Sequence, residues 1–357
     1  MRKKIKIILG LSGGVDSAVA AAILKDRGWK IRAVRLNLSK NALGRGPGRD
    51  EKDARAVAEH LDIPYSTLDL SREFEKRVIR PFVNDYLSGI TPNPCVHCNP
   101  HIKFNALINE ALKEGADRIA TGHYARINDL GGEKRLFRGK DGTSDQSYFL
   151  ARLKRPQIEC FIAPLGDLTR QEVLRIAREK QIPVAPKPSS QEICFIEQDY
   201  RDFLLQREEA AGKIGPGDIV DRSGRVLGRH RGLPFYTIGQ RGGLGISWSH
   251  PLYVIRIEPE KNRLVVGRKE EVYSRETLVG DLEWHSHGEG EREFRSEVQI
   301  RYRHRAAPAV VIPAPGDNQA RVLFEAPQPA VTPGQTAVFY RGDLVLGAGT
   351  ILPDPCV

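Results

Sequence analysis

Three cysteines offer thiol chemistry in this chain. Cys95 and Cys98 stand three positions apart in TPNPCVHCN, residues 91–99, and Cys194 stands in EICFI, residues 192–196. A thiolate is both a nucleophile and a metal ligand. A Cys-x-x-Cys pair is therefore compatible with a zinc site, a redox pair, an iron–sulfur cluster, or a nucleophile beside an unused neighbour.

Zinc and simple redox chemistry are the weaker interpretations. A structural zinc site normally needs four protein ligands, and the sequence has no second Cys-x-x-Cys. A redox pair ordinarily belongs to a thioredoxin-like unit, which the sequence does not show. Cys98 stands just ahead of a segment with helical spacing and close to Lys103. Because a helix N-terminus or a nearby cation lowers the pKa of a thiol, we expect Cys98 to be functional.

The remaining cysteines are read more simply. Cys160 is expected to be a buried small apolar residue, and Cys356 an exposed thiol near the end of the chain. Five cysteines are few and odd in number, so they do not predict the disulfide framework of a secreted protein.

A glycine-rich loop, GLSGGVDSA at residues 10–18, follows the aliphatic run KIKIILG directly. Glycines let backbone N–H groups converge on an anion, and the N-terminus of a following helix adds partial positive charge. The loop lacks the lysine of a Walker loop, and Asp16 is a candidate carboxylate for Mg²⁺ beside the phosphates. The simpler alternative is a glycine turn before a helix capped by Asp16 or Ser17.

Strand and helix patterns alternate up to about residue 180, which predicts an α/β domain with a parallel sheet whose ligands lie at the carboxyl ends of the strands. Pro81 predicts a kink or break in the helical segment 71–89. After Gly212 the segments become short and β-rich, and those from about 273 predict a small C-terminal β-barrel. In IRYRHRA, residues 300–306, a strand would place its three arginines on one face. We therefore expect three domains, at residues 1–200, 201–272 and 273–357.

Composition is that of a globular protein, with 40% hydrophobic and 28% charged residues in 357. No apolar run approaches the roughly 20 residues of a membrane span, and the N-terminal run is too short for a signal peptide, so we expect a cytoplasmic protein without a membrane partner. The formal net charge of +10 is compatible with an anionic partner such as nucleic acid.

The motif SGGVDS resembles the PP-loop of ATP pyrophosphatases, an adenine nucleotide alpha hydrolase-like fold. That resemblance implies ATP and Mg²⁺, adenylation of an oxygen, and release of pyrophosphate and AMP. The motifs TPNPCVHCN, ATGHYAR, DQSYFL, SSQEICFI, YTIGQRGGLGI, RYRH and VTPGQTAVFY follow in this order. Together they closely resemble the tRNA-specific 2-thiouridylase (MnmA) family, which places sulfur on carbon 2 of the wobble uridine, and the resemblance runs nearly end to end.

The resemblance implies roles for individual residues. Cys98 matches the nucleophile of the family, and Cys194 matches the residue that carries the persulfide sulfur. The positions that match ATP contacts are Gly10, Leu11, Ser12, Gly13, Gly14, Val15, Asp16, Ser17, Leu36 and Gly122. The positions that match tRNA contacts are Asn93, Pro94, Cys95, His123, Ser144, Asp145, Gln146, Arg301, Tyr302 and Gln335. Two positions depart from many relatives: Cys95 replaces an aspartate, which puts any acid/base role there in doubt, and Gly242 replaces a lysine.

Two sulfur-transfer schemes remain open on the sequence. In one, a donor protein loads a persulfide on Cys194, its terminal sulfur attacks the adenylated uridine, and Cys98 then forms a disulfide with Cys194. In the other, Cys95, Cys98 and Cys194 hold an iron–sulfur cluster whose open iron carries hydrosulfide. Alternative functions are another PP-loop RNA thiolase, such as a cytidine 2-thiolase, or a tRNA-binding protein without catalysis.

Overall fold

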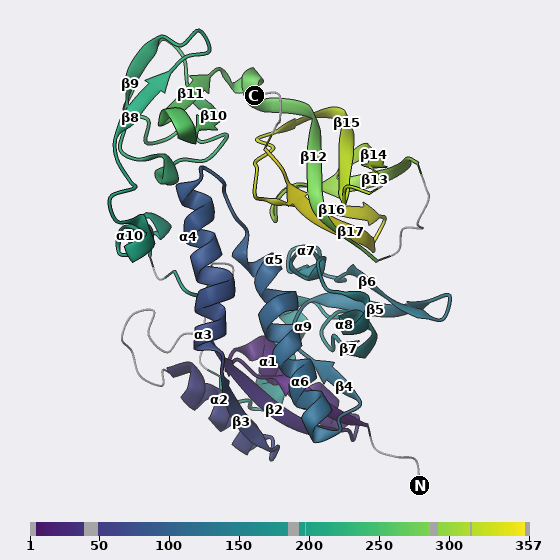
Figure 1. Cartoon of the computed structure of the whole chain (residues 1–357). Helices are drawn as coiled ribbons and strands as arrows, with labels where there is room; N and C mark the ends of the chain where they lie inside the picture. Colours follow the sequence, from purple (N-terminus) through teal and green to yellow (C-terminus); the bar gives the residue numbers. More distant parts are fainter. Residues whose placement is uncertain are drawn as a thin grey trace. The chain divides into compact units, whose positions relative to one another are not determined.

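The computed structural model describes residues 5–38, 49–184, 193–196, 198–285, 292–314 and 316–353. The chain divides into two compact units (Figure 1). Unit 1 comprises Met1–Arg77, Cys95–Phe195 and Asp343–Val345; unit 2 comprises Val78–Pro94, Ile196–Gly342 and Leu346–Val357. Cys356 lies outside the described residues. No helix in the described part of the chain is long and apolar enough to cross a bilayer.

Unit 1 is built on a five-stranded sheet in the order β3-β2-β1-β4-β7, in which every neighbouring pair is parallel. Its strands are β1 (Lys6–Gly10), β2 (Lys30–Asn37), β3 (Tyr65–Asp69), β4 (Arg118–Ala120) and β7 (Phe161–Ile162). The aliphatic residues of β1 are fully buried, as a strand covered on both faces requires. The α/β prediction is confirmed.

Helices connect and cover these strands. They are α1 (Val15–Asp26), α2 (Arg49–His60), α6 (Asn105–Glu114), α7 (Ser147–Leu150), α8 (Arg155–Cys160) and α9 (Arg170–Glu179). The alanine-rich α1 shares one core with the apolar face of α9, represented by Val173 and Ala177. A hairpin of β5 (Ala125–Leu130) and β6 (Glu133–Arg138) completes unit 1.

The strand order reverses at β1. From β1 the chain proceeds outward through β2 and β3, and later returns to the other side of β1 with β4. The carboxyl ends of β1 and β4 therefore lie side by side at a topological switch point, where open α/β sheets bind ligands. The loops after these two strands begin at Leu11 and Thr121.

The segment containing Pro81 does not break. It runs through α3 (Ser71–Phe74), a π-helix (Glu75–Ile79) and α4 (Arg80–Leu87), with Pro81 in the first turn of α4. Proline is tolerated in a first turn, and the predicted irregularity takes the form of the wider π-helical turn just before it.

Unit 2 contains α4, the short helix α10 (Tyr200–Leu205) and a four-stranded sheet in the order β10-β11-β8-β9. Its strands are β8 (Gly217–Val220), β9 (Val226–His230), β10 (Tyr253–Glu258) and β11 (Arg263–Gly267). Ile219, Val254 and Leu264 are central to its core. The predicted β-rich character of this region is confirmed.

Six further strands form the C-terminal barrel: β12 (Tyr273–Trp284), β13 (Phe294–Gln299), β14 (Ala307–Ala314), β15 (Gln319–Pro329), β16 (Thr336–Arg341) and β17 (Leu344–Ile351). They follow the order β12-β15-β14-β13-β16-β17, and pairing of β12 with β17 closes the ring. The predicted barrel is confirmed.

The predicted strand over residues 300–306 is wrong. β13 ends at Gln299, and the chain turns, with the N–H of His304 donating to the carbonyl of Arg301 at 3.0 Å. The amide of Gln299 donates to the carbonyls of Arg301 (3.2 Å) and Tyr302 (2.6 Å), which holds the turn. The three arginines of this segment therefore do not share one face of a strand.

Candidate nucleotide and thiol sites

The glycine loop leaves β1 at Gly10 and enters α1. The N–H of Leu11 still donates to the carbonyl of Val34 at 3.0 Å, so the loop starts from the sheet itself. Gly13 has φ +81°, and a Cβ there would lie 2.5 Å from the carbonyl oxygen of Asp50. Gly14 precedes α1 without any side-chain cap. The first N–H groups of α1 are thus left for an outside acceptor, as in an anion site, and capping by Asp16 or Ser17 does not occur.

Two serines shape this loop. The buried hydroxyl of Ser17 accepts from the N–H of Ser12 at 3.1 Å and donates to the carbonyl of Gly14 at 3.0 Å. The hydroxyl of Ser12 lies 3.1 Å from that of Ser17, and Ser12 is exposed. Ser17 therefore fixes the curvature of the loop, whereas the Ser12 hydroxyl remains accessible to a ligand.

Gly122 brings the end of β4 against this loop. A Cβ on Gly122 would lie 2.6 Å from the backbone nitrogen of Ser17, so only glycine permits this approach. Leu36, the other position expected to touch the nucleotide, is half-buried in β2 and pairs with Leu68 of β3.

The carboxylate of Asp16, in the first turn of α1, is held by two residues from distant segments. Its Oδ1 accepts from the hydroxyl of Tyr124 at 2.8 Å and forms an ion pair with Arg170. Burial raises the pKa of Asp16, while Tyr124 and Arg170 act in the opposite direction. Oδ2 hydrogen-bonds no described residue, which leaves one carboxylate oxygen for a cation. The oxygen is a donor of the kind that Mg²⁺ prefers.

Sequence reasoning missed Tyr124 and Arg170. Tyr124 follows directly on the TGH segment, so its place beside the loop is foreseeable from the switch point. Arg170 is the first residue of α9, where Thr169 caps the helix by accepting from the N–H of Glu172 at 3.2 Å. The cap predicts where α9 starts, but nothing local indicates that its first residue reaches Asp16.

The segment with the Cys-x-x-Cys pair is helical. α5 (Pro94–Cys98), a π-helix (Asn99–Phe104) and α6 form one run, in which Cys98 is the last residue of α5. The expectation that Cys98 stands ahead of a helix is wrong, because Pro94 at the start of α5 begins the run four residues earlier. Cys98 is 4% exposed and Cys95 is partly buried.

The thiols of Cys95, Cys98 and Cys194 all interact electrostatically with the ammonium group of Lys103. Burial raises the pKa of Cys98 to about 12 and that of Cys95 to about 11, and in both cases the charge of Lys103 opposes the rise. Burial acts to lower the pKa of Lys103, but the three neighbouring thiols outweigh it and the pKa is raised. Burial thus disfavours the thiolate forms, and the charge of Lys103 favours them.

Cys194 lies in the same group, because its thiol interacts electrostatically with Lys103, Cys95 and Cys98. The residue is exposed, yet the protein around its sulfur withdraws enough water to raise the pKa of the thiol. Phe195, 4% exposed, anchors the segment through an edge contact with Phe74, whose ring centroid is 5.7 Å away.

The structure bears on two of the expected states of the cysteines, the disulfide and the iron–sulfur cluster. Cys95, Cys98, Cys160 and Cys194 are all free thiols. Within the described ranges, no group of three or more His, Cys, Asp or Glu side chains is arranged to hold a metal ion. The three cysteines do not fit a cluster in this state. Cys160 is partly rather than fully buried, and its thiol donates to the carbonyl of Gln157 at 3.4 Å.

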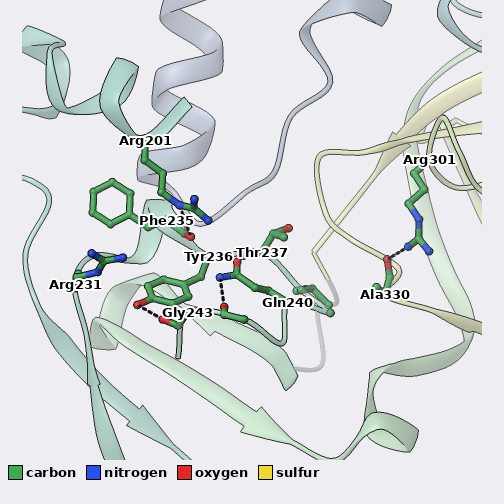
Figure 2. Close-up of a pocket in the computed structure, with 12 residues that line it drawn as sticks. Arg201, Arg231, Phe235, Tyr236, Thr237, Gln240, Gly243, Arg301 and Ala330 are labelled. Carbon is green, nitrogen blue, oxygen red and sulfur yellow. Dashed lines mark hydrogen bonds between the residues drawn. The ribbon is translucent and has the colours of Figure 1, made fainter. Parts of the chain in front are cut away.

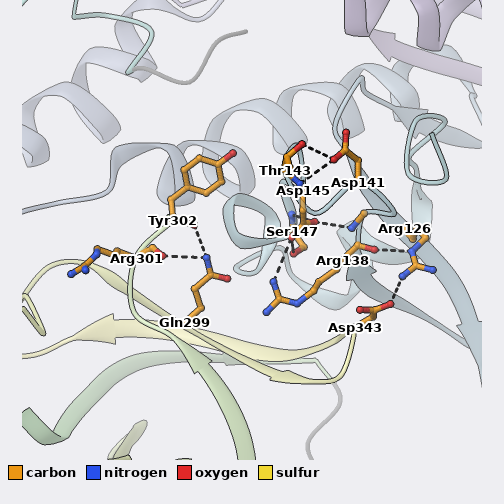
Figure 3. A network of polar contacts seen from close by, with 11 residues as sticks. Arg126, Arg138, Asp141, Thr143, Asp145, Ser147, Gln299, Arg301, Tyr302 and Asp343 are labelled. Carbon is orange, nitrogen blue, oxygen red and sulfur yellow. Dashed lines mark hydrogen bonds and ion pairs between the residues drawn. The ribbon is translucent and has the colours of Figure 1, made fainter. Parts of the chain in front are cut away.

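Most of the unit 1 side chains that were expected to contact tRNA form hydrogen bonds within the protein. His123 Nδ1 lies 2.7 Å from the hydroxyl of Thr121, and burial together with Lys103 lowers its pKa to about 3. The carboxylate of Asp145 accepts from the N–H of Gly139 (2.7 Å) and from the hydroxyl of Ser147 (2.8 Å), within the network in Figure 3.

The neighbours of Asp145 are also bound to the protein. The side-chain carbonyl of Gln146 accepts from the N–H of Tyr124 at 3.0 Å. The N–H of Ser144 donates to the carbonyl of Asp141 at 3.0 Å. These bonds fix the 141–147 loop, and the hydroxyl of the partly exposed Ser144 also bonds to the carboxylate of Asp141.

The expected tRNA contacts in unit 2 include residues that position others. The amide of Gln335 donates to the carbonyls of Thr91 (2.9 Å) and Pro92 (3.4 Å), so it holds the backbone that leads into Asn93 and Pro94. Arg301 donates to the carbonyls of Pro329 (3.1 Å) and Ala330 (3.4 Å), and Tyr302 is partly exposed beside it in the turn.

Comparison with known proteins accounts for nearly the whole chain. Three family models match in succession: a tRNA methyl transferase HUP domain over residues 5–198, a tRNA methyl transferase PRC-barrel domain over 201–268, and an aminomethyltransferase beta-barrel domain over 274–351.

Similar full-length proteins carry a common name. The tRNA-specific 2-thiouridylase MnmA of Carboxydothermus hydrogenoformans is 43% identical, over 97% of this chain and 97% of the relative. Those of Moorella thermoacetica (46% identical; 96% and 98% covered) and Acetivibrio thermocellus (43% identical; 98% and 100% covered) are similar throughout. With this identity over 96–98% of its length, the chain belongs to the tRNA-specific 2-thiouridylase (MnmA) family.

Proposed function

We propose that this protein uses ATP to replace the 2-oxygen of the wobble uridine of tRNA by sulfur. One observation in this structure supports the activity named for the relatives. The glycine loop and Gly122 meet at the switch point of the sheet in unit 1, and the same unit contains Cys98 and Cys194, whose thiols both interact electrostatically with Lys103. A nucleotide site and a reactive sulfur site are the two parts that such a reaction needs.

The nucleotide step belongs to the loop at residues 10–17 together with Leu36 and Gly122. Backbone N–H groups at the start of α1 and the Ser12 hydroxyl would bind the phosphates, and the Asp16 carboxylate would help to hold Mg²⁺, which would offset the phosphate charge. Arg170 supplies positive charge beside the carboxylate. Bound ATP supplies an adenylyl group: uridine O2 attacks the α-phosphorus, pyrophosphate leaves, and the 2-oxygen becomes part of an AMP leaving group.

The sulfur step uses Cys194 and Cys98. A sulfur-donor protein first leaves a persulfide on Cys194, whose terminal sulfur attacks carbon 2 of the adenylated uridine and displaces AMP. The Cys98 thiolate then attacks Sγ of Cys194. This breaks the Sγ–S bond, releases the 2-thiouridine, and leaves a Cys98–Cys194 disulfide. A dithiol reductant restores both thiols with two electrons and two protons, so each turnover is balanced.

Lys103 fits this step because it favours ionisation of both thiols, whose pKa values burial raises. Cys95 makes or breaks no bond in this route. The geometry of the three cysteines favours the persulfide route over a cluster, because they do not form a metal-binding group among the described residues.

We assign tRNA recognition to Asn93, Pro94, Cys95, His123, Ser144, Asp145, Gln146, Arg301, Tyr302 and Gln335. Of these, Gln335, Asp145 and Gln146 act through the loops that their side chains hold. The target base has to leave its stack to reach both sites, so a splayed base is recognised near Asn93. We place the ATP and thiol chemistry in residues 1–200, and further tRNA contacts in 201–272 and 273–357.

A reconstituted reaction tests this function. The protein is incubated with a tRNA transcript, ATP, Mg²⁺ and a persulfide-loaded sulfurtransferase, and the nucleosides and nucleotides are separated and identified by mass. The proposal expects 2-thiouridine at the wobble position, with one AMP and one pyrophosphate for each sulfur transferred. Sulfur found in cytidine indicates the other thiolase class. Bound tRNA without any ATP cleavage indicates a non-catalytic binding protein, and either result overturns the proposal.

A further inference from the structure

Unit 2 contains a pocket of about 700 Å³ that lies apart from the glycine loop and the thiols in sequence. Three arginines line it: Arg201 from α10, Arg231 after β9, and Arg301 from the turn after β13 (Figure 2). None of its described lining residues is acidic. A pocket of this size is large enough for a nucleotide.

The floor of the pocket is a loop with fixed geometry. Gln240 accepts from the N–H of Thr237 (3.2 Å) and donates to the carbonyl of Gly242 (2.8 Å) with the same side-chain amide. The loop is tied to β10, because the N–H of Gly239 donates to the carbonyl of Val254 at 2.8 Å. Gly239, with φ +85°, lies so near Ala330 that a Cβ would be 2.6 Å from that side chain. The pocket is therefore built before any ligand arrives.

The arginines retain unused donors. Arg201 donates to Asp199 (3.0 Å) and to the carbonyl of Phe235 (3.3 Å), and Arg301 donates to two carbonyls through one nitrogen. Arg231 is exposed and forms no hydrogen bond or ion pair with any described residue. A guanidinium group has five N–H donors, so each of the three still offers some. Asp199 is the only acidic side chain bonded to these three guanidinium groups among the described residues, so their remaining positive charge favours an anion.

We propose that this pocket binds a nucleotide of the tRNA through its backbone phosphate. The inference rests on the proposed function, which makes tRNA the substrate, and adds a phosphate site formed by Arg201, Arg231 and Arg301. Planar guanidiniums suit the paired oxygens of a phosphodiester, and the two tethered arginines hold a fixed position. Arg231 is the free group that closes on the phosphate.

Removal of Arg231 gives the first test. Arg231→Gln is expected to weaken tRNA binding about tenfold at moderate salt and to lower the slope of log affinity against log salt by about one. The matched control is Arg229→Gln, which removes the same charge from an exposed position two residues earlier that does not line the pocket. Equal affinity and equal salt slope for the Arg231 variant and the wild type overturn the proposal.

Gly242 offers a gain-of-function test that misfolding cannot imitate. Gly242 lines the pocket, is exposed, has no positive φ, and a Cβ there would meet nothing within 4 Å. Gly242→Lys adds a cation at the rim and is expected to tighten tRNA binding several-fold, with a steeper salt dependence. Unchanged or weaker binding by this variant, folded to the same melting temperature, counts against the proposal.

The source of the phosphate is distinguished by parallel titrations with inorganic phosphate and AMP. The proposal expects the Arg231→Gln variant and the wild type to bind inorganic phosphate with equal affinity, and AMP likewise, at concentrations of these anions that occupy the glycine loop. If these small anions lose affinity while tRNA does not, the pocket is a small-molecule site and the RNA assignment is wrong. If wild-type protein neither binds nor thiolates tRNA, the proposed function itself fails, which is a separate result.

Discussion

The backbone of Gly122 lies against the backbone of Ser17, because a Cβ on Gly122 would be 2.6 Å from the Ser17 nitrogen. This contact joins the end of β4 to the first turn of α1. Gly122→Ala is therefore expected to push the two apart, lowering stability by about 1–3 kcal/mol and weakening ATP binding.

Calorimetric ATP titration and urea unfolding check this expectation. Gly215→Ala is the control, because a Cβ there would meet nothing within 4 Å and φ is not positive. Normal ATP affinity in a stable Gly122→Ala protein would show that the contact does not shape the nucleotide site.

The ion pair between Asp16 and Arg170 predicts a pH dependence. Burial already raises the pKa of Asp16, and Arg170→Gln removes a charge that opposes the rise. A carboxyl group with a raised pKa destabilises the fold when it is ionised, above that pKa, and not when it is protonated. The variant should therefore lose more stability at pH 7 than near pH 4, by about 1–3 kcal/mol at the higher pH.

Urea unfolding at the two pH values measures this difference. Arg175→Gln on the same helix, where Arg175 pairs with Glu179 at the surface, should change stability little at either pH. If Arg170→Gln lowers the free energy of unfolding equally at both pH values, the interaction of Arg170 with Asp16 does not account for the loss of stability.

Lys103 is expected to control the reactivity of Cys194. Because the charge of Lys103 opposes the raised pKa of this thiol, Lys103→Met should raise the pKa further and slow alkylation by iodoacetamide at pH 8.5 several-fold. Peptide mass spectrometry follows the rate at each cysteine. Lys113→Met, at an exposed lysine of α6, is the control. An unchanged rate in the Lys103 variant would remove Lys103 from the sulfur step.

Charge reversal at Arg301 is expected to weaken tRNA binding more than tenfold and leave ATP binding intact. Arg301→Glu loses two hydrogen bonds to the 329–330 backbone and places a negative charge in the arginine pocket. Filter binding at several salt concentrations measures the effect. Arg295→Glu makes the same charge change on the exposed face of β13, and a loss as large there would show general repulsion.

Much of the architecture is predictable from local patterns. Short local patterns predict several elements: the buried aliphatic run of β1, the helix after the glycine loop, and the capped start of α9. The alternation of strands and helices then implies the parallel sheet. The glycine loop is recognisable because its function depends on consecutive residues.

Other features depend on contacts between distant segments. Arg170 reaches Asp16 from 154 residues away, and no local pattern encodes that pairing. The alternating arginines of RYRHR match the period of a strand. However, the side-chain amide of Gln299 donates to the carbonyls of Arg301 and Tyr302 and stabilises a turn there instead. Pro94 was an available signal for the start of α5. The burial of Cys98, which raises the pKa of its thiol, follows from tertiary packing alone.

The central claim is that one nucleotide loop and two thiols transfer sulfur to uridine. It is tested most directly by the 2-thiouridine content of tRNA after a single turnover with persulfide-loaded protein. Wild type should yield close to one 2-thiouridine per active site and a Cys98–Cys194 disulfide in tryptic peptides. Asp16→Asn, Cys98→Ser and Cys194→Ser should yield almost none while still binding tRNA. Full thiolation by all three variants would contradict the account.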